Sequence, residues 1–221
     1  MVDDNLRVVA EVDVLFLTVK PQLISKVLES LDGAVTEKHL VASIVGGLQL
    51  KQMAKVLGDK VRLVRIAPNT ACAIGSSATG YAMGPTATQA DAALMGELLS
   101  AVGTAHQLDE KSVDAVTGLA GSGIAFVYLM IEAMSDGGVL MGLPRELSTE
   151  MAAQTMFGGA EMVLRTGEHT GVLTDRVASP GGTTIEGINA METGAVRAAL
   201  MDAVRVATEK SIALAKMSEG R

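Results

Sequence analysis

V-L-F-L-T-V, residues Val14 to Val19, is a short and unbroken apolar run that is followed by Lys20-Pro21. A second such run lies at Leu40 to Val45 and ends in Gly46-Gly47. Val61 to Ile66, V-R-L-V-R-I, is predicted as a third strand, and residues with helical spacing separate the three segments. Short runs without alternation are typical of strands that are buried on both faces of a parallel sheet. Residues 14–66 therefore predict strand, helix, strand, helix, strand, which is half of a doubly wound α/β sheet.

The pattern changes about halfway along the chain. A further strand is expected at Ala78 to Met83 and a helix at Gln89 to Val102, whereas no strand signal follows Asp109. We place a domain boundary near residue 107, between an α/β part (residues 1–107) and an all-helical part (residues 108–221). The expected helices of the second part run from Asp109 to a stop at Gly137-Gly138, and over Arg145–Arg165, Gly171–Ala178, Thr184–Glu192 and Val196–Ala215.

Composition limits the class of protein. Of the 221 residues 48% are hydrophobic and only 2% aromatic, so Met, Ala and Gly fill the core of a globular chain. The net charge of −7 argues against a nucleic-acid partner, which would need clustered Lys and Arg.

Three features bear on the compartment. The central apolar run Ile124 to Ile131 is shorter than the roughly 20 residues that span a bilayer, so no membrane partner is expected. Met1 to Asn5 lacks the basic and apolar segments of a secretory signal, and the single Cys72 has no partner for an internal disulfide. These features predict a cytoplasmic protein.

A glycine-rich turn between two predicted helices is the strongest candidate site. Residues Asp175 to Ile188 read D-R-V-A-S-P-G-G-T-T-I-E-G-I. Thr183 and Thr184 open a helix, whose N-terminus favours anions, and Gly181 and Gly182 allow a small carboxylate to approach the backbone. An ordinary corner in which the Ser and Thr residues only cap helices explains the same residues, and local chemistry leaves both interpretations open.

Three blocks in a fixed order resemble pyrroline-5-carboxylate reductase, the last enzyme of proline biosynthesis. They are D-A-V-T-G-L-A-G-S-G from Asp114, E-A-M-S-D-G-G-V-L-M-G-L-P-R from Glu132, and S-P-G-G-T-T-I from Ser179. The resemblance extends from V-K-P-Q at Val19 to about Ala215. It implies a partial Rossmann-like parallel sheet that binds a dinucleotide, followed by an all-α dimerisation and substrate domain.

The resemblance also implies a reaction and its residues: an oxidoreductase that uses NADPH or NADH to reduce 1-pyrroline-5-carboxylate to L-proline. The residues implied for the cofactor are Thr18, Val19, Lys20, Pro21, Ile44, Val45, Gly46, Asn69 and Glu110. Those implied for the substrate are Ser179, Gly181, Gly182, Thr183 and Thr184, of which Thr184 is the candidate catalytic residue because its hydroxyl can donate to the imine nitrogen. The family's homodimer, or a larger homo-oligomer, is expected to place the active site between two subunits.

One element of the family pattern is missing from this sequence. A dinucleotide-binding sheet normally begins with a strand that leads into G-x-G-x-x-G, and no such segment precedes Val14. We expect the neighbouring strand to keep an open edge and the N-terminal half to be poorly stable. The alternative function is therefore a non-catalytic, dimer-forming homologue that has lost tight dinucleotide binding. A metal site is not expected, because His39, His106 and His169 show no paired ligand spacing.

Overall fold

The computed structural model describes residues 4–219, and the side chains of residues 4–216. Met1–Asp3, part of the segment compared with a secretory signal, lie outside the described residues. The chain forms two compact units, one of Met1–Ile124 with Ala203–Arg221 and the other of Ala125–Asp202. The last strand ends at Gln107, but the helix that follows stays with the α/β unit, so the boundary near residue 107 stays a prediction.

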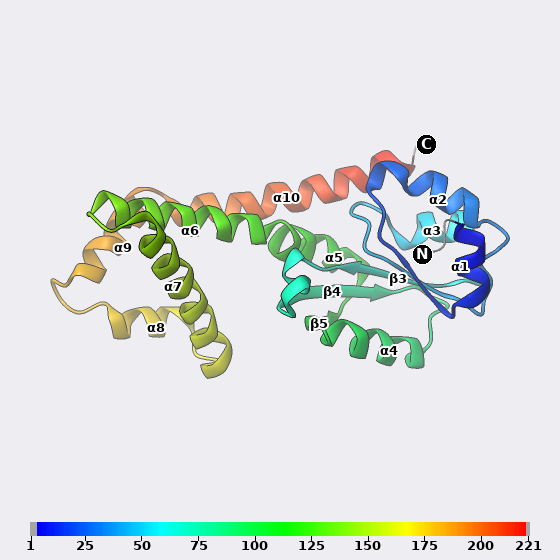
Figure 1. Ribbon diagram of the computed structural model, residues 1–221, viewed down its shortest axis with the longest axis horizontal. Coiled ribbons are helices and arrows are strands. Elements are labelled where there is room, and N and C mark those ends of the chain that lie inside the picture. The colour runs from blue at the N-terminus through cyan, green and yellow to red at the C-terminus, as the bar shows by residue number, and fades with distance from the viewer. Residues whose placement is uncertain (1–3, 220–221) are drawn as a thin grey trace. The chain divides into compact units, whose positions relative to one another are not determined.

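The first unit contains a five-stranded sheet in the order of the sequence (Figure 1). The first three strands are parallel, as predicted, and the fourth and fifth are parallel to each other. The pairing of the third strand with the fourth is antiparallel, so the sheet is mostly rather than wholly parallel. The strands are β1 (Val14–Leu17), β2 (Leu40–Ser43), β3 (Arg62–Ala67), β4 (Ser77–Met83) and β5 (Gly103–Gln107).

β5 was not predicted from the sequence. Its residues, G-T-A-H-Q, contain no apolar run, and β5 forms because it pairs with β4 from Ser77 opposite Gly103 to Tyr81 opposite Gln107. Gly103 has a φ of +148°, and a Cβ there would lie 2.1 Å from the Ser77 carbonyl oxygen. A strand that depends on pairing with a neighbour leaves little local signal.

Helices cover both faces of the sheet, which explains why β2 and β3 are buried along almost all of their length. α1 (Asn5–Glu11), α2 (Ile24–Leu31), α3 (Leu50–Leu57) and α5 (Glu110–Val116) contribute to one core, and α4 (Gln89–Ser100) packs in the other. Alternate residues of β3 belong to the two cores: Leu63 and Ala67 to the first, Val64 and Ile66 to the second. Two 3-10 turns, η1 (Pro21–Leu23) and η2 (Thr70–Ile74), follow β1 and β3.

A long helical run joins the units. It consists of α5, a π-helical turn η3 (Thr117–Gly121), and α6 (Gly123–Leu140), so the predicted stop at Gly137-Gly138 was wrong. By length and composition the run Glu110–Leu140 is apolar enough to cross a membrane, whereas the sequence analysis considered only Ile124 to Ile131. The mostly buried core helices of soluble proteins meet the same two criteria, whereas only 17% of the apolar window in this run is buried within the single chain.

The second unit is all-helical, as predicted. Besides α6 it contains α7 (Arg145–Thr166), α8 (Thr170–Val177), α9 (Thr183–Thr193) and the start of α10 (Val196–Glu219). α6 and α7 approach closely: the Ser148 hydroxyl donates to the Ser135 carbonyl at 2.7 Å, and a Cβ on Gly138 would lie 2.1 Å from Ser148 Oγ. These contacts explain the small residues Ser135, Gly138 and Ser148 at this point of α6 and α7.

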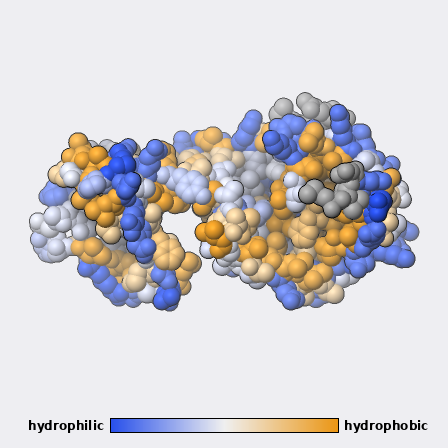
Figure 2. All heavy atoms as spheres, viewed as in Figure 1, coloured by the Kyte–Doolittle hydropathy of each residue, from blue (hydrophilic) through white to orange (hydrophobic). Residues whose placement is uncertain are grey.

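Large apolar side chains lie on the surface of the second unit, where orange residues are visible in Figure 2. Leu140 is 85% exposed and Leu164 is 81% exposed, and further exposed apolar residues are Tyr128, Leu129, Met141, Met151, Phe157, Met162 and Met191. A surface with this much apolar area is typical of a subunit interface.

Candidate active site

The residues predicted to bind the cofactor lie at one edge of the sheet. Thr18–Pro21 follow β1, Ile44–Gly46 follow β2, and Asn69 follows β3, so all three segments lie at the carboxyl ends of adjacent parallel strands. The Ile44 amide donates to the Leu17 carbonyl at 3.1 Å, which holds the first two segments together. Doubly wound sheets bind ligands at this edge.

Asn69 ties the end of β3 to two other segments. Its side-chain oxygen accepts from the Ala71 amide at 3.1 Å and so caps η2, and its backbone amide donates to Ser77 Oγ at 3.1 Å. Its Nδ2 donates to the Ala120 carbonyl in the π-helical turn η3 at 3.4 Å. π-Helical turns are frequent at functional sites, because the extra residue redirects backbone groups.

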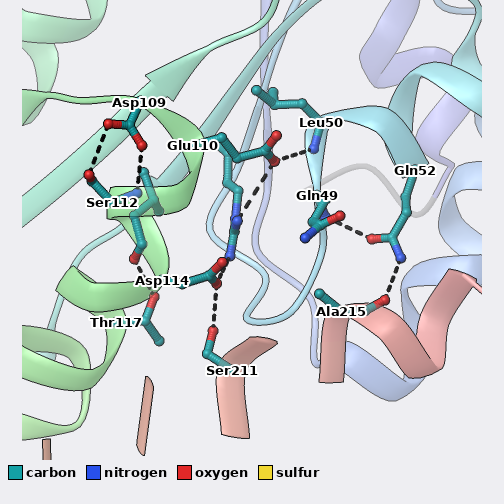
Figure 3. A network of polar contacts seen from close by, with 12 residues as sticks. Gln49, Leu50, Gln52, Asp109, Glu110, Ser112, Asp114, Thr117, Ser211 and Ala215 are labelled. Atoms are coloured by element: carbon teal, nitrogen blue, oxygen red, sulfur yellow. Dashed lines mark hydrogen bonds and ion pairs between the residues drawn. The ribbon is translucent and has the colours of Figure 1, made fainter. Parts of the chain in front are cut away.

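Glu110 lies in the first turn of α5 and faces the start of α3. Its Oε1 accepts the Leu50 backbone N–H at 2.7 Å, which satisfies one of the free amides at the N-terminus of α3 (Figure 3). Its side chain is 32% exposed, so the carboxylate has access to both the core and solvent. The prediction that Glu110 binds at the edge used by the cofactor is compatible with this position.

Asp109 fixes the start of α5. Its carboxylate accepts the Ser112 backbone N–H at 2.8 Å and the Ser112 hydroxyl at 3.0 Å, which makes it the N-cap. The Ser112 backbone hydrogen bond, followed by the one from the Ser112 hydroxyl, lowers the pKa of Asp109 below its usual value. The contribution of this cap to stability is therefore present above the usual pKa of an aspartate and is lost as the pH falls through the lowered pKa.

Three functional candidates were missed by the sequence analysis: Arg65 on β3, Asp114 on α5 and Ser211 on α10. Arg65 Nη2 lies 2.6 Å from Asp114 Oδ1, and the Ser211 hydroxyl donates to that same oxygen at 2.9 Å. Both members of the ion pair are almost fully buried. Arg65 lies within V-R-L-V-R-I-A, and a charged residue in a buried strand requires a partner of opposite charge. This sequence feature could have predicted the ion pair.

The substrate corner is formed by a tight turn between α8 and α9. The Gly182 amide donates to the Ser179 carbonyl at 3.0 Å, with Pro180 second and Gly181 third in the turn. Gly181 has a φ of +64°, as the third residue of a type II turn requires. A Cβ on Gly182 would lie 2.5 Å from Ser179 Oγ, so a larger residue there would require the Ser179 side chain to move, whereas the positive φ of Gly181 itself favours glycine.

The first turn of α9 has no side-chain cap among the described residues. Its N-cap is Gly182, and Thr183 and Thr184 are already helical. Their hydroxyls therefore do not cap this helix, contrary to the ordinary-corner interpretation, and its first amides point outward as they do in anion-binding helices. Ser179, Gly181 and Thr183 are exposed, and Thr184 is half-buried.

Thr184 also faces an apolar groove within the helical unit. The groove lies between α7, α8 and the start of α9, and its lining includes Met162, Val163, Leu173, Val177 and Thr184. The nearby Arg176 pairs with Glu168 at 2.5 and 2.7 Å, so its charge is already matched. The arrangement joins an anion-accepting helix start to an apolar wall, which fits a small ring that carries a carboxylate.

Other candidates remain outside the site. Cys72 is a free, exposed cysteine on η2. No group of three or more His, Cys, Asp or Glu side chains among residues 4–216 could hold a metal ion. His39 accepts a hydrogen bond from a nearby backbone amide instead, since its Nδ1 lies 2.9 Å from the Thr36 nitrogen. His169 is the N-cap of α8. The predicted absence of a metal stays a prediction.

A family model and several relatives match this chain. The model for pyrroline-5-carboxylate reductase dimerisation matches residues 110–214. A pyrroline-5-carboxylate reductase of Methanosarcina acetivorans is 47% identical, over 96% of this chain and 79% of the relative. The Arabidopsis thaliana pyrroline-5-carboxylate reductase is 45% identical, over 93% of this chain and 74% of the relative.

Solved structures agree with these sequences. The pyrroline carboxylate reductase of Plasmodium falciparum, solved with NADP bound, has a TM-score of 0.91 and 32% identity, over 97% of this chain and 81% of that one. The pyrroline-5-carboxylate reductase of Coxiella burnetii has a TM-score of 0.89 and 31% identity, over 96% of this chain and 80% of that one.

Proposed function

The chain belongs to the pyrroline-5-carboxylate reductase family, and from that premise we infer that it reduces 1-pyrroline-5-carboxylate to L-proline with NAD(P)H. The assignment to residues rests on the corner before α9, where two glycines precede a helix start that no side chain in the described part of the chain caps. Titration of the purified chain with NADPH tests the cofactor requirement. Binding is expected, whereas no binding would favour the non-catalytic homologue.

The residues at the strand ends fit the nicotinamide half of the cofactor. The Gly46 backbone is open, since a Cβ there would meet no atom within 4 Å, and Thr18, Asn69 and Glu110 supply polar groups at the same edge. We assign Thr18–Pro21, Ile44–Gly46, Asn69 and Glu110 to this part of the site. When bound, the reduced nicotinamide supplies the hydride for the C=N carbon.

The corner before α9 is assigned to the substrate. The first amides of α9 and the Thr183 hydroxyl would hold the carboxylate, because a helix start favours an anion. The turn Ser179–Gly182 lets the small acid approach the backbone, and the apolar wall beside Thr184 matches the methylene groups of the ring. The reaction requires that the nicotinamide at the strand ends and the substrate at the corner before α9 meet, because the hydride passes directly from one to the other.

Thr184 is assigned as the donor to the imine nitrogen. The neutral imine nitrogen can accept from the Thr184 hydroxyl, and once protonated to the iminium near neutral pH its N–H donates to the Thr184 oxygen instead. The chain therefore needs no strong acid, and a hydroxyl is enough to orient the ring. Most of the rate enhancement then comes from holding hydride donor and acceptor together, which is worth up to about 7–11 kcal/mol in favourable cases.

Replacing Thr184 with alanine is expected to lower kcat for NADPH oxidation by about 10- to 100-fold, the value of one hydrogen bond to a charged group. Thr184→Ser keeps the hydroxyl and should restore most of the activity. Thr193→Ala is the matched control, because Thr193 lies at the other end of α9 and its hydroxyl donates to the Asn189 carbonyl of the same helix at 2.8 Å. Equal turnover for Thr184→Ala and the native chain would remove Thr184 from this role.

We propose that a homodimer is the smallest active form. The exposed apolar residues of the helical unit and the dimerisation family model support assembly through this unit. Light scattering should give at least twice the mass of one chain. Leu129→Glu should shift the mass towards one chain, whereas Leu94→Glu, at an exposed position of α4, should not. A native mass equal to one chain would contradict the proposal.

We further propose that the protein is soluble and cytoplasmic, with neither nucleic acid nor membrane as a partner. The formal charge of −7 and the relation to enzymes of amino-acid biosynthesis support this proposal. The apolar run Glu110–Leu140 is then explained by subunit contacts, because the exposed part of that helix belongs to the unit matched by the dimerisation model.

A further inference from the structure

Arg65 is a buried charge whose surroundings are otherwise mainly apolar. It lies on β3 between Leu63 and Ala67, on the face of the sheet that these two residues share with the larger core, and its side chain is only 3% exposed. Removing a guanidinium from water costs several kcal/mol, so such a residue needs strong partners. A buried arginine in this position is therefore not explained by packing.

One half of the guanidinium is firmly held. Nη2 lies 2.6 Å from Asp114 Oδ1, and that oxygen also accepts the Ser211 hydroxyl at 2.9 Å. The three residues come from β3, α5 and α10, and Figure 3 shows Asp114 and Ser211 facing each other across the gap between their helices. This arrangement fixes the plane of the guanidinium, since two elements determine the place of the carboxylate.

The other half of the guanidinium is not hydrogen-bonded. Arg65 Nη1 is a buried atom without a hydrogen-bond partner among the described residues. The Glu110 carboxylate is near it, with Oε1 3.7 Å from Nη1, and this oxygen already accepts the Leu50 amide at 2.7 Å. Glu110 and Asp114 are one helical turn apart on α5, so both carboxylates face the same cation.

We propose that Arg65 is a positioning residue for Glu110 and that α10, through Ser211 and Asp114, holds Arg65 in place for this role. The guanidinium attracts the Glu110 carboxylate while the N-terminus of α3 binds the same oxygen, so Glu110 is kept in one place at the cofactor edge. The inference rests on the proposed function for the contact between Glu110 and the cofactor.

Gln52 gives α10 a second connection to the same region. Its Nε2 donates to the Ala215 carbonyl at 2.8 Å, while its side-chain oxygen accepts the Gln49 amide at 2.8 Å in the capping box of α3. The N-terminus of α3, to which Glu110 binds, is thus linked to α10 by Gln52 and by the chain Ser211, Asp114, Arg65. The C-terminal helix is therefore part of the support of the cofactor edge.

The test uses Arg65→Lys and Ser211→Ala, each in the native chain and in a Glu110→Gln background. In the native background both variants should raise the Kd and KM for NADPH, by about tenfold for Arg65→Lys, with kcat changed much less. In the Glu110→Gln background neither variant should weaken NADPH binding further, because the residue that they position has already lost its charge. Lys210→Ala, at an exposed position of α10, is the matched control.

A readout without cofactor separates this inference from the proposed function. In the ¹⁵N-labelled protein, Arg65→Lys and Ser211→Ala should shift the Leu50 amide resonance and speed its hydrogen exchange, and Lys210→Ala should do neither. An unmoved Leu50 amide, or NADPH-binding losses that simply add to those of Glu110→Gln, would overturn the positioning role. If Leu50 responds but Glu110→Gln leaves NADPH affinity unchanged, the proposed cofactor contact of Glu110 fails and the positioning of Glu110 stands.

Discussion

Replacing Asp114 with alanine is expected to lower the free energy of unfolding by about 3–5 kcal/mol, because the buried Arg65 then loses its close ion-pair partner and keeps only the 3.7 Å contact with the Glu110 carboxylate. The side chains of Arg65 and Asp114 are 3% and 7% exposed, so little water can replace the lost carboxylate. Ser211 would lose its acceptor as well. Urea unfolding at a fixed protein concentration measures the change, as a shift in the midpoint with an unchanged slope.

Asp136→Ala is the matched control for this prediction. Asp136 also pairs with an arginine, since its Oδ1 lies 2.6 Å from Arg145 Nη1, but both side chains are more than half exposed. A solvated ion pair contributes about 0–1 kcal/mol, so this variant should remain close to the native chain. Asp114→Asn should lie between the two, because the amide keeps an oxygen for Ser211 and Arg65 but loses the charge. Equal losses for Asp114→Ala and Asp136→Ala would contradict the buried network.

Replacing Gly118 with valine is expected to destabilise the α/β unit by about 3 kcal/mol or more. Gly118 lies in the π-helical turn η3 and is in close contact with the backbone of α10. A Cβ at this position would lie 2.1 Å from Thr208 Oγ1, 2.8 Å from the Val204 carbonyl oxygen and 2.9 Å from the Thr208 backbone nitrogen. The Thr208 side chain can move aside, but two of these atoms belong to the backbone of α10, so the helix itself must shift.

The matched controls for Gly118 are alanine substitutions. Gly118→Ala adds the Cβ alone and should already cost about 1–3 kcal/mol. Gly123→Ala, five residues later in the same helical run, meets no atom within 4 Å and should be neutral or stabilising by up to about 1 kcal/mol. Thermal unfolding of the variants at one concentration tests this order. A Gly118→Val variant as stable as Gly123→Ala would show that α10 does not pack against η3.

The parallel core of the fold was predictable because its signal is local. Val14–Val19, Leu40–Val45 and Val61–Ile66 are rich in apolar residues, and β1 and β2 are found within the first two runs, while β3 matches the third to within one residue at each end. The helices after Asp109 were also found, with ends that differ by a few residues. β5 was missed because its residues pair only with β4, and the stop expected at Gly137-Gly138 was wrong because helix packing there requires small residues.

The candidate site was predictable in part. The glycines of the corner and the threonines after it follow from turn and helix-start chemistry, and three sequence blocks related them to a family. The absence of a side-chain cap on α9 was not predictable, because Ser, Thr and Gly are all favoured at that position. The residues that hold Glu110 in place were also not predictable, because no local sequence pattern indicates that β3 packs near α10.

The sequence by itself determined the two kinds of structure in this chain, their order, and the corner between α8 and α9, because each depends on residues that are near one another. Only the tertiary structure decided that Arg65 meets Asp114, 49 residues away, and that Asp114 meets Ser211, a further 97 residues along. Apolar periodicity specifies which face of an element is buried. It does not specify which polar partner is buried opposite, because that depends on how β3, α5 and α10 pack.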